Sequence, residues 1–184
     1  MNLSERDRAA HEALRARQGR GARYDAAEAP AEDLLLARRA TAFFARKLNA
    51  LDDAALRLPA PGCVARTRAH IVAEVGYDAR RLALALDPFC PAHSGVPPEM
   101  HPDKLPSVDL AASLPARALR YLFQHSAIHL DVCWRDLPGP AWAATVETAG
   151  QGALTVRDLP RLRATSLKRH AQALGLANAT DGHS

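Results

Sequence analysis

The sequence predicts an all-α fold, an up-and-down four-helix bundle with a peripheral N-terminal helix and a small β-hairpin before the last helix. Four segments carry apolar side chains at the three- and four-residue spacing of amphipathic helices. They occupy residues 31–50, 64–86, 113–137 and 158–175. No internal repeat or clear linker separates them, so a single bundle accounts for all four.

The chain divides into three predicted parts. Residues 1–30 form an N-terminal helix and loop, residues 31–176 form the bundle, and residues 177–184 form a polar tail that is predicted to be disordered. The N-terminal helix is expected over residues 5–18, which are rich in Ala, Arg and Glu. Its apolar stripe is thin, which predicts peripheral packing.

Proline and glycine mark the breaks between the bundle helices. A Pro-Gly turn at 59–62 precedes the second helix, and six prolines exclude a long helix between residues 87 and 109. Ser113 and Pro115 suit the start of the third helix, as a capping residue and an early proline. Residues 142–146 and 153–156 flank a Gly-Gln-Gly turn, which predicts the hairpin.

Composition limits the classes of function. The chain has 184 residues, 48% hydrophobic and 24% charged, which is ordinary for a globular domain. No apolar run approaches the ~18 residues that a transmembrane helix needs. Three cysteines without CxxC spacing predict reduced thiols. These features predict a cytoplasmic protein without a membrane partner.

Charge patterning argues against nucleic-acid binding. The net charge of +4 comes mainly from arginines that are dispersed among acidic residues along the helices. The sequence has no basic block and few aromatic side chains for stacking on bases.

The second helix carries a pair of potential metal ligands. His70 and Glu74 are four residues apart, so their side chains share one helical face. The same spacing also suits an ordinary surface hydrogen bond. Metal sites in bundles use inward-facing side chains from facing helices, and the last helix offers His170 with Ser166 one turn before it.

Several segments resemble the N-terminal domains of mycothiol-dependent maleylpyruvate isomerases, which are DinB-like metal-binding four-helix bundles. The similar segments are residues 61–80, 114–119, 125–137 and the Leu-Pro-x-x-Arg start of the last helix at 159–163. The resemblance spans roughly residues 30–176.

This resemblance implies a divalent metal, usually zinc, and a low-molecular-weight thiol, either mycothiol or glutathione. In the family, a His of the second helix and a Glu-x-x-x-His pair of the last helix hold the metal. The cation lowers the pKa of the thiol and yields a nucleophilic thiolate. The thiolate adds to the double bond of maleylpyruvate, permits rotation, and leaves to give fumarylpyruvate.

The sequence departs from this family pattern at the metal ligands. The histidine position of the second helix falls on Glu74, and the glutamate position of the last helix falls on Ser166. Only His170 keeps its ligand type. A rearranged site of His70, Glu74 and His170 would restore three ligands, but His70 lies one turn away, about 5–6 Å along the helix. The alternative is an altered or empty site.

Other residues are candidates for binding a substrate. Arg80 and Arg81 could pair with a carboxylate, since arginine binds carboxylates through two parallel hydrogen bonds; the alternative is a solvated helix face. His129 is a further candidate, with a core hydrogen-bonding role as its alternative. The expected partner is a small carboxylate substrate, and a homodimer is compatible with the fold.

Two functions remain open at this point. One is a thiol-dependent isomerase or transferase of the maleylpyruvate type with a divalent metal. The other is a catalytically degenerate bundle that has lost the metal and serves as a small-molecule-binding or interaction module. The changes at Glu74 and Ser166 favour the second function, while the similarity along the bundle favours a bound small molecule.

Overall fold

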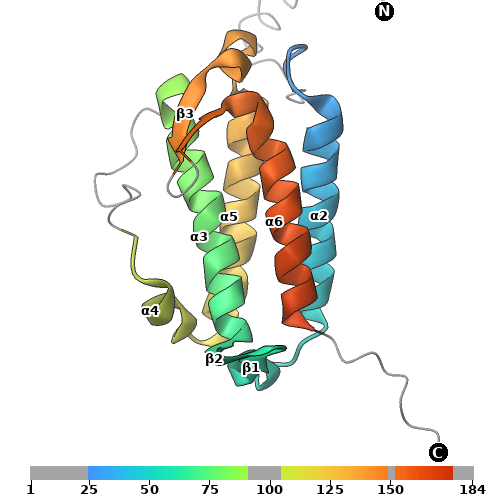
Figure 1. Cartoon of the computed structure of the whole chain (residues 1–184), viewed down its shortest axis with the longest axis vertical. Helices are drawn as coiled ribbons and strands as arrows, with labels where there is room; N and C mark the ends of the chain where they lie inside the picture. The colour runs from blue at the N-terminus through green and yellow to red at the C-terminus, as the bar shows by residue number, and fades with distance from the viewer. Residues whose placement is uncertain (1–24, 91–104, 149–151, 176–184) are drawn as a thin grey trace, which may run out of the picture.

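The structure, a computed structural model, describes residues 25–90, 105–148 and 152–175. Four long helices run side by side in it (Figure 1). They are α2 (Ala31–Asn49), α3 (Arg68–Leu86), α5 (Ala116–Asp136) and α6 (Leu159–Leu174). This arrangement confirms the predicted four-helix bundle. The helix predicted at 5–18 and the tail predicted at 177–184 lie outside the described residues.

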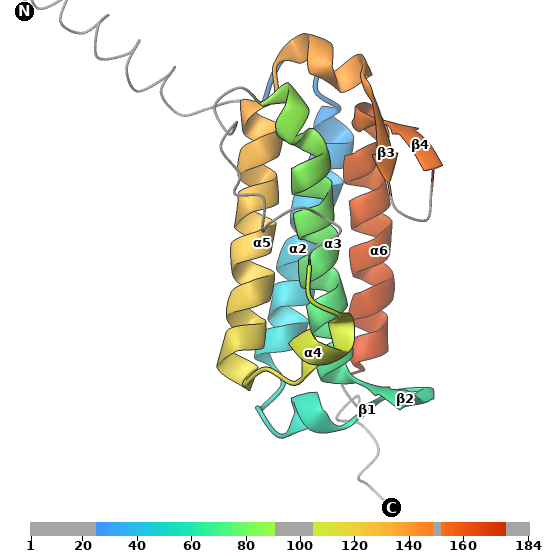
Figure 2. The same cartoon turned by 90° about the vertical axis from the view of Figure 1, so that its left-hand side faces the viewer.

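The helices pack in two main pairs, α2 with α6 and α3 with α5, and α3 also contacts α6. Figures 1 and 2 show that α3 and α5 run in one direction, whereas α2 and α6 run in the other. Parallel neighbours need a long crossover connection. The proline-rich stretch between α3 and α5 supplies it. None of the described helices is both long and apolar enough to cross a membrane.

Short elements occupy the described ends of this crossover. The 3-10 helix η2 (Asp87–Phe89) follows α3, and the short helix α4 (Val108–Ala112) precedes α5. The predicted start of the third helix is therefore three residues too early, because Ser113 ends α4 and α5 begins only after Pro115. The Ser107 hydroxyl caps α4 by accepting a hydrogen bond from the backbone N–H of Leu110.

The start of α3 also differs from the prediction. Residues 64–67 were predicted to be helical, but Cys63–Thr67 forms strand β2, which pairs with β1 (Pro59–Ala60). Gly62 makes the turn between the two strands at φ 75°, a backbone conformation that glycine adopts without strain. Thr67 has extended backbone and stands at the N-cap, so the helix begins at Arg68. The 3-10 helix η1 (Ala55–Arg57) precedes β1.

The predicted hairpin before the last helix is confirmed. Strands β3 (Thr145–Thr148) and β4 (Gly152–Thr155) pair antiparallel, with Thr145 opposite Thr155. Trp142, predicted to lie in the first strand, belongs instead to the 3-10 helix η6 (Gly139–Ala143) and is fully buried. The 3-10 helix η7 (Val156–Asp158) leads into α6, whose first turn accommodates Pro160.

Close packing of α3 against α5 depends on small side chains. In the core, the rings of Phe44 and Phe123 lie 4.9 Å apart, and α3 contributes buried alanines and Gly76. A Cβ atom at Gly76 would lie 2.9 Å from Cγ of Leu122 on α5. Contacts this short force the neighbouring side chain to move.

We therefore expect Gly76→Val to lower the free energy of unfolding by about 1–3 kcal/mol, through overpacking against Leu122. Urea denaturation of the variant measures this loss. Leu122→Ala is the matched partner: it creates space at the same contact, so the double variant should lose less stability than the two single variants summed. Additive losses would show that this contact is not the cause.

An ion-pair cluster ties the start of the described chain to the bundle. The guanidinium of Arg38 donates two hydrogen bonds of 2.7 Å to the Asp25 carboxylate and one of 2.8 Å to Asp131 on α5. Hydrogen bonding to Arg38 holds the pKa of Asp25 below its usual value. Since the folded state keeps Asp25 ionised, this pair stabilises the fold above the ordinary pKa of the carboxyl group, and the contribution disappears as the pH falls.

Asp25→Asn should accordingly make the melting temperature less dependent on pH below about pH 5. Between pH 5 and pH 2 the melting temperature of the unaltered protein should fall more steeply than that of the variant. Thermal melts across this pH range measure the difference. Equal slopes for the two proteins would contradict a role for Asp25 in acid sensitivity.

Candidate functional site

Glu74 on α3 faces His170 on α6 across the bundle. Its Oε2 atom lies 3.5 Å from Nε2 of His170. The same oxygen accepts a hydrogen bond of 2.8 Å from Arg66, which comes from β2. His170 is only 7% exposed. The carboxylate thus lies between a guanidinium and a buried imidazole.

Ser166 fixes the orientation of the His170 ring. Nδ1 of His170 lies 2.8 Å from the backbone carbonyl oxygen of Ser166 and 3.2 Å from its hydroxyl oxygen. A carbonyl oxygen can only accept, which assigns a proton to Nδ1. Neutral His170 therefore presents the lone pair of Nε2 toward Glu74.

His70 has a different role in the structure. The backbone N–H of Thr67 donates a hydrogen bond of 3.1 Å to its Nδ1 atom, which completes a capping box at the start of α3. Its Nε2 atom lies 3.4 Å from Oδ1 of Asp109 on α4. Both ring nitrogens are therefore engaged, and the structure does not bring His70 to Glu74 and His170.

The donor set does not fit a divalent metal. No group of three His, Cys, Asp or Glu side chains within the described ranges is placed to hold a metal ion. Glu74 and His170 supply two ligands, and Ser166 offers only a neutral hydroxyl. The Arg66 guanidinium occupies the Glu74 oxygen that faces His170. Zinc sites need at least three protein ligands of suitable type, and the described residues supply only two at this position.

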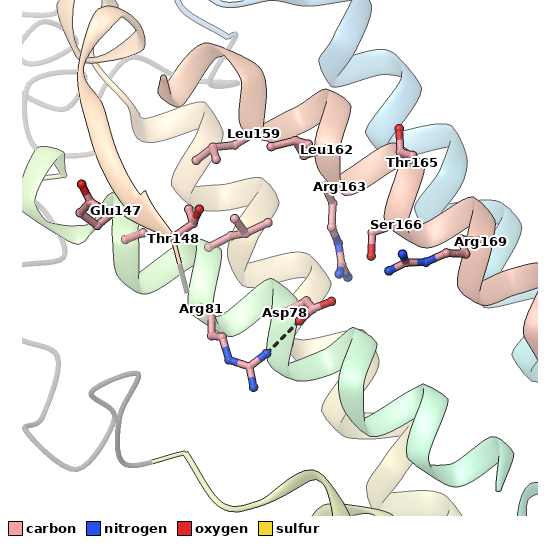
Figure 3. Close-up of a pocket in the computed structure, with 12 residues that line it drawn as sticks. Asp78, Arg81, Glu147, Thr148, Leu159, Leu162, Arg163, Thr165, Ser166 and Arg169 are labelled. Atoms are coloured by element: carbon pink, nitrogen blue, oxygen red, sulfur yellow. Dashed lines mark hydrogen bonds and ion pairs between the residues drawn. The ribbon is translucent and has the colours of Figure 1, made fainter. Parts of the chain in front are cut away.

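A cavity of about 360 Å³ borders this cluster, and Figure 3 shows the side chains around it. Its walls come from α3, α6 and the strand β3. The lining has an apolar part and a polar part. The apolar part is formed by Leu82, Ala85, Leu159 and Leu162. The polar part is formed by Asp78, Arg81, Glu147, Thr148, Arg163, Thr165, Ser166 and Arg169. The volume is within the range of small-molecule sites. Ser166 lines the cavity and also contacts His170, whereas His170 and Glu74 are not among the described lining residues.

Three arginines and two acidic residues line the cavity, which gives it a net positive charge. Arg81 donates a hydrogen bond of 2.9 Å to Asp78, and Arg163 and Arg169 extend from α6 on the opposite wall (Figure 3). Such a cavity favours an anionic ligand.

Of the three residues that the sequence predicts to bind a substrate, one lines the cavity and two do not. Arg81 lines the cavity, whereas Arg80 is not among the described lining residues. His129 lies on α5, where its Nε2 atom is 3.8 Å from Sγ of Cys133, and it also does not line the cavity.

The three cysteines are free thiols, as predicted. Burial raises the pKa of Cys90 to about 11 and that of Cys133 to about 12. Both remain protonated at neutral pH and are poor nucleophiles. Neither buried cysteine therefore supplies a reactive thiolate to the site.

Comparison with known proteins identifies the family. The family model described as the mycothiol maleylpyruvate isomerase N-terminal domain matches residues 37–175. The chain belongs to this family. Two solved structures also match, those of the mycothiol-dependent maleylpyruvate isomerase and of a histidine-to-alanine mutant of it. No curated protein sequence matches significantly.

Both solved structures are similar to this chain to the same extent. Each has 29% sequence identity and a TM-score of 0.67, and each alignment covers 79% of this chain. The chain spans 60% of the length of those relatives. The family membership confirms the resemblance that the sequence predicts.

Sequence reasoning did not select Arg66, Asp78 or Arg163 as site residues. Arg163, Ser166 and His170 are spaced three and four residues apart, which places them on one face of α6. That spacing could have revealed Arg163. The contact of Arg66 depends on strand β2, which the sequence did not predict, so no local pattern indicated it.

Restoring a third ligand should create metal binding. We expect the unaltered protein to purify without stoichiometric zinc and to gain no thermal stability from added zinc. The double variant Arg66→Met, Ser166→Glu removes the competing guanidinium and adds a carboxylate one turn before His170, so zinc should raise its melting temperature and EDTA should reverse the effect.

Arg66→Met combined with Thr165→Glu is the matched control, because Thr165 is an exposed residue of the cavity lining whose hydroxyl donates to the backbone carbonyl of Arg161, whereas Ser166 contacts His170. Elemental analysis of the purified proteins gives the metal content. Stoichiometric zinc in the unaltered protein would contradict the interpretation of the donor set.

Proposed function

We propose that this chain activates a low-molecular-weight thiol through His170, without a divalent metal, and uses it in isomerase or transferase chemistry on a small carboxylate. The observation that carries this proposal is the position of His170. Its Nε2 atom faces the Glu74 carboxylate at 3.5 Å, and Ser166, which holds its other nitrogen, lines a positively charged cavity.

The residues present can supply what the metal supplies in the solved relatives' family. A neutral imidazole with a free Nε2 lone pair accepts a proton from a thiol, and the resulting imidazolium stabilises the thiolate. Glu74 faces the same nitrogen at 3.5 Å and attracts the positive charge of the imidazolium. Arg66 holds the Glu74 carboxylate in place through its hydrogen bond. The proton thus moves to Nε2 of His170.

The bound thiol supplies a nucleophile that adds reversibly to an electron-poor double bond. The chain contributes the base, the positive charge of the cavity and the apolar wall that excludes water. Mycothiol is the first candidate thiol, because the family and both solved relatives are described as mycothiol-dependent. Glutathione is the second, and maleylpyruvate is the first candidate substrate.

A non-catalytic binding module is the second candidate function. The ion pair between Arg66 and Glu74 and the serine at position 166 favour it, since both oppose a metal site. In that case the cavity binds a small molecule but no turnover follows.

An activity assay separates these functions. The purified protein is tested with maleylpyruvate in the presence of mycothiol, of glutathione, or of neither thiol. We expect thiol-dependent isomerisation that EDTA does not reduce. His170→Gln should lower kcat by about 10²-fold or more through loss of the base, while the control variant His125→Gln, at an exposed histidine of α5, should retain activity.

The outcomes discriminate clearly. Inhibition by EDTA that zinc restores would overturn the metal-free mechanism. Thiol binding by calorimetry with no turnover would establish the binding module instead. Unchanged kcat in His170→Gln would exclude His170 as the base.

A further inference from the structure

Arg163 is buried, and none of the described residues forms an ion pair with it. The residue is 3% exposed, and neither Nη1 nor Nη2 has a hydrogen-bond partner among the described residues. A buried charge that lacks a partner is strongly destabilising. Buried guanidinium groups are normally paired, so this one requires an explanation.

Asp78 is the acidic residue whose charge acts on Arg163. Its carboxylate already accepts a hydrogen bond of 2.9 Å from Arg81. Burial lowers the pKa of Arg163 to about 10, which still leaves the group charged at neutral pH. The structure therefore holds a positive charge that its own carboxylates do not neutralise by contact.

Arg163 lines the cavity between α3 and α6. Figure 3 shows its guanidinium extending from α6 toward the side of the cavity formed by Asp78, close to Ser166. The lining also has an apolar part, which is formed by Leu82, Ala85, Leu159 and Leu162. One unpaired cation thus stands beside a hydrocarbon surface in a space large enough for a small organic molecule.

We propose that Arg163 anchors the carboxylate of a small organic acid whose hydrocarbon part packs against this apolar wall. The planar guanidinium presents two parallel N–H groups, which match the two oxygens of a carboxylate. This inference deepens the proposed function, on which its catalytic meaning rests, by assigning the class of the second ligand and the residue that recognises it.

A singly charged carboxylate fits better than a phosphate. The guanidinium of Arg163 carries one positive charge, which one negative charge neutralises. Asp78 and Glu147 line the same cavity and repel a second negative charge on the ligand. The leucines favour a ligand with an apolar body. Inorganic phosphate offers neither property.

Ligand-induced stabilisation tests the assignment without any thiol. Melting temperatures and calorimetric titrations are recorded with hexanoate, benzoate and inorganic phosphate. We expect one or both carboxylates to bind the unaltered protein and to raise its melting temperature. Arg163→Met should weaken carboxylate binding by about tenfold or more. Arg163→Lys should weaken it less, because it keeps the charge but not the paired geometry.

The matched control is Lys168→Met, which removes an exposed positive charge of α6 that is not among the described lining residues of the cavity. It should change the affinity by less than about threefold, as expected of a surface charge. Arg163→Met should also melt at a higher temperature than the unaltered protein when no ligand is present, because it replaces a buried unpaired charge with an apolar side chain.

Several results would overturn the assignment. These are no carboxylate binding by the unaltered protein, preference for phosphate, or equal weakening by Arg163→Met and Lys168→Met. Loss of folding in both Arg163 variants would show a structural role instead. Carboxylate binding that persists when the thiol assay fails would refute the proposed function alone, whereas thiol-dependent turnover without an effect of Arg163 would refute this inference alone.

Discussion

The hydrogen bond from Arg66 to Glu74 determines what the centre of the bundle can bind. In this position a guanidinium neutralises the carboxylate at 2.8 Å and leaves it directed toward His170. A divalent cation would have to displace it or share the same oxygen with a like charge, which is unfavourable. The geometry of α3 and α6 that could serve a metal serves a carboxylate–imidazole pair instead.

The same helix face of α6 carries both features of the site. Arg163, Ser166 and His170 follow one another at helical spacing, so α6 fixes the position of the Arg163 guanidinium relative to the His170 ring. Ser166 connects them, since its carbonyl oxygen orients the imidazole and its side chain lines the cavity. A rigid helix positions such groups more accurately than a loop does.

The bundle was predictable because periodic apolar patterns over 16–21 residues determine helices strongly. The segment 63–67 was not, since five residues next to a helix start carry little periodic signal and pair with only two others. That error hid the contact of Arg66 and made His70 look available as a ligand. The family resemblance placed Glu74 and His170 at ligand positions on facing helices, and the structure has their side chains 3.5 Å apart. A spacing rule cannot show that Arg66 binds the Glu74 carboxylate.

The proposed anion site accounts for an Arg163 that is buried and has no hydrogen-bond partner for Nη1 or Nη2 among the described residues. A methionine at this position would fill similar volume and remove the cost of desolvating a charge. A fold selected for stability alone would replace it, whereas a site for an anion requires the charge to stand ready before the ligand arrives. The preformed guanidinium lowers the stability of the empty protein, and the ligand restores that stability when it binds. The same group that weakens the free bundle thus gives it its selectivity.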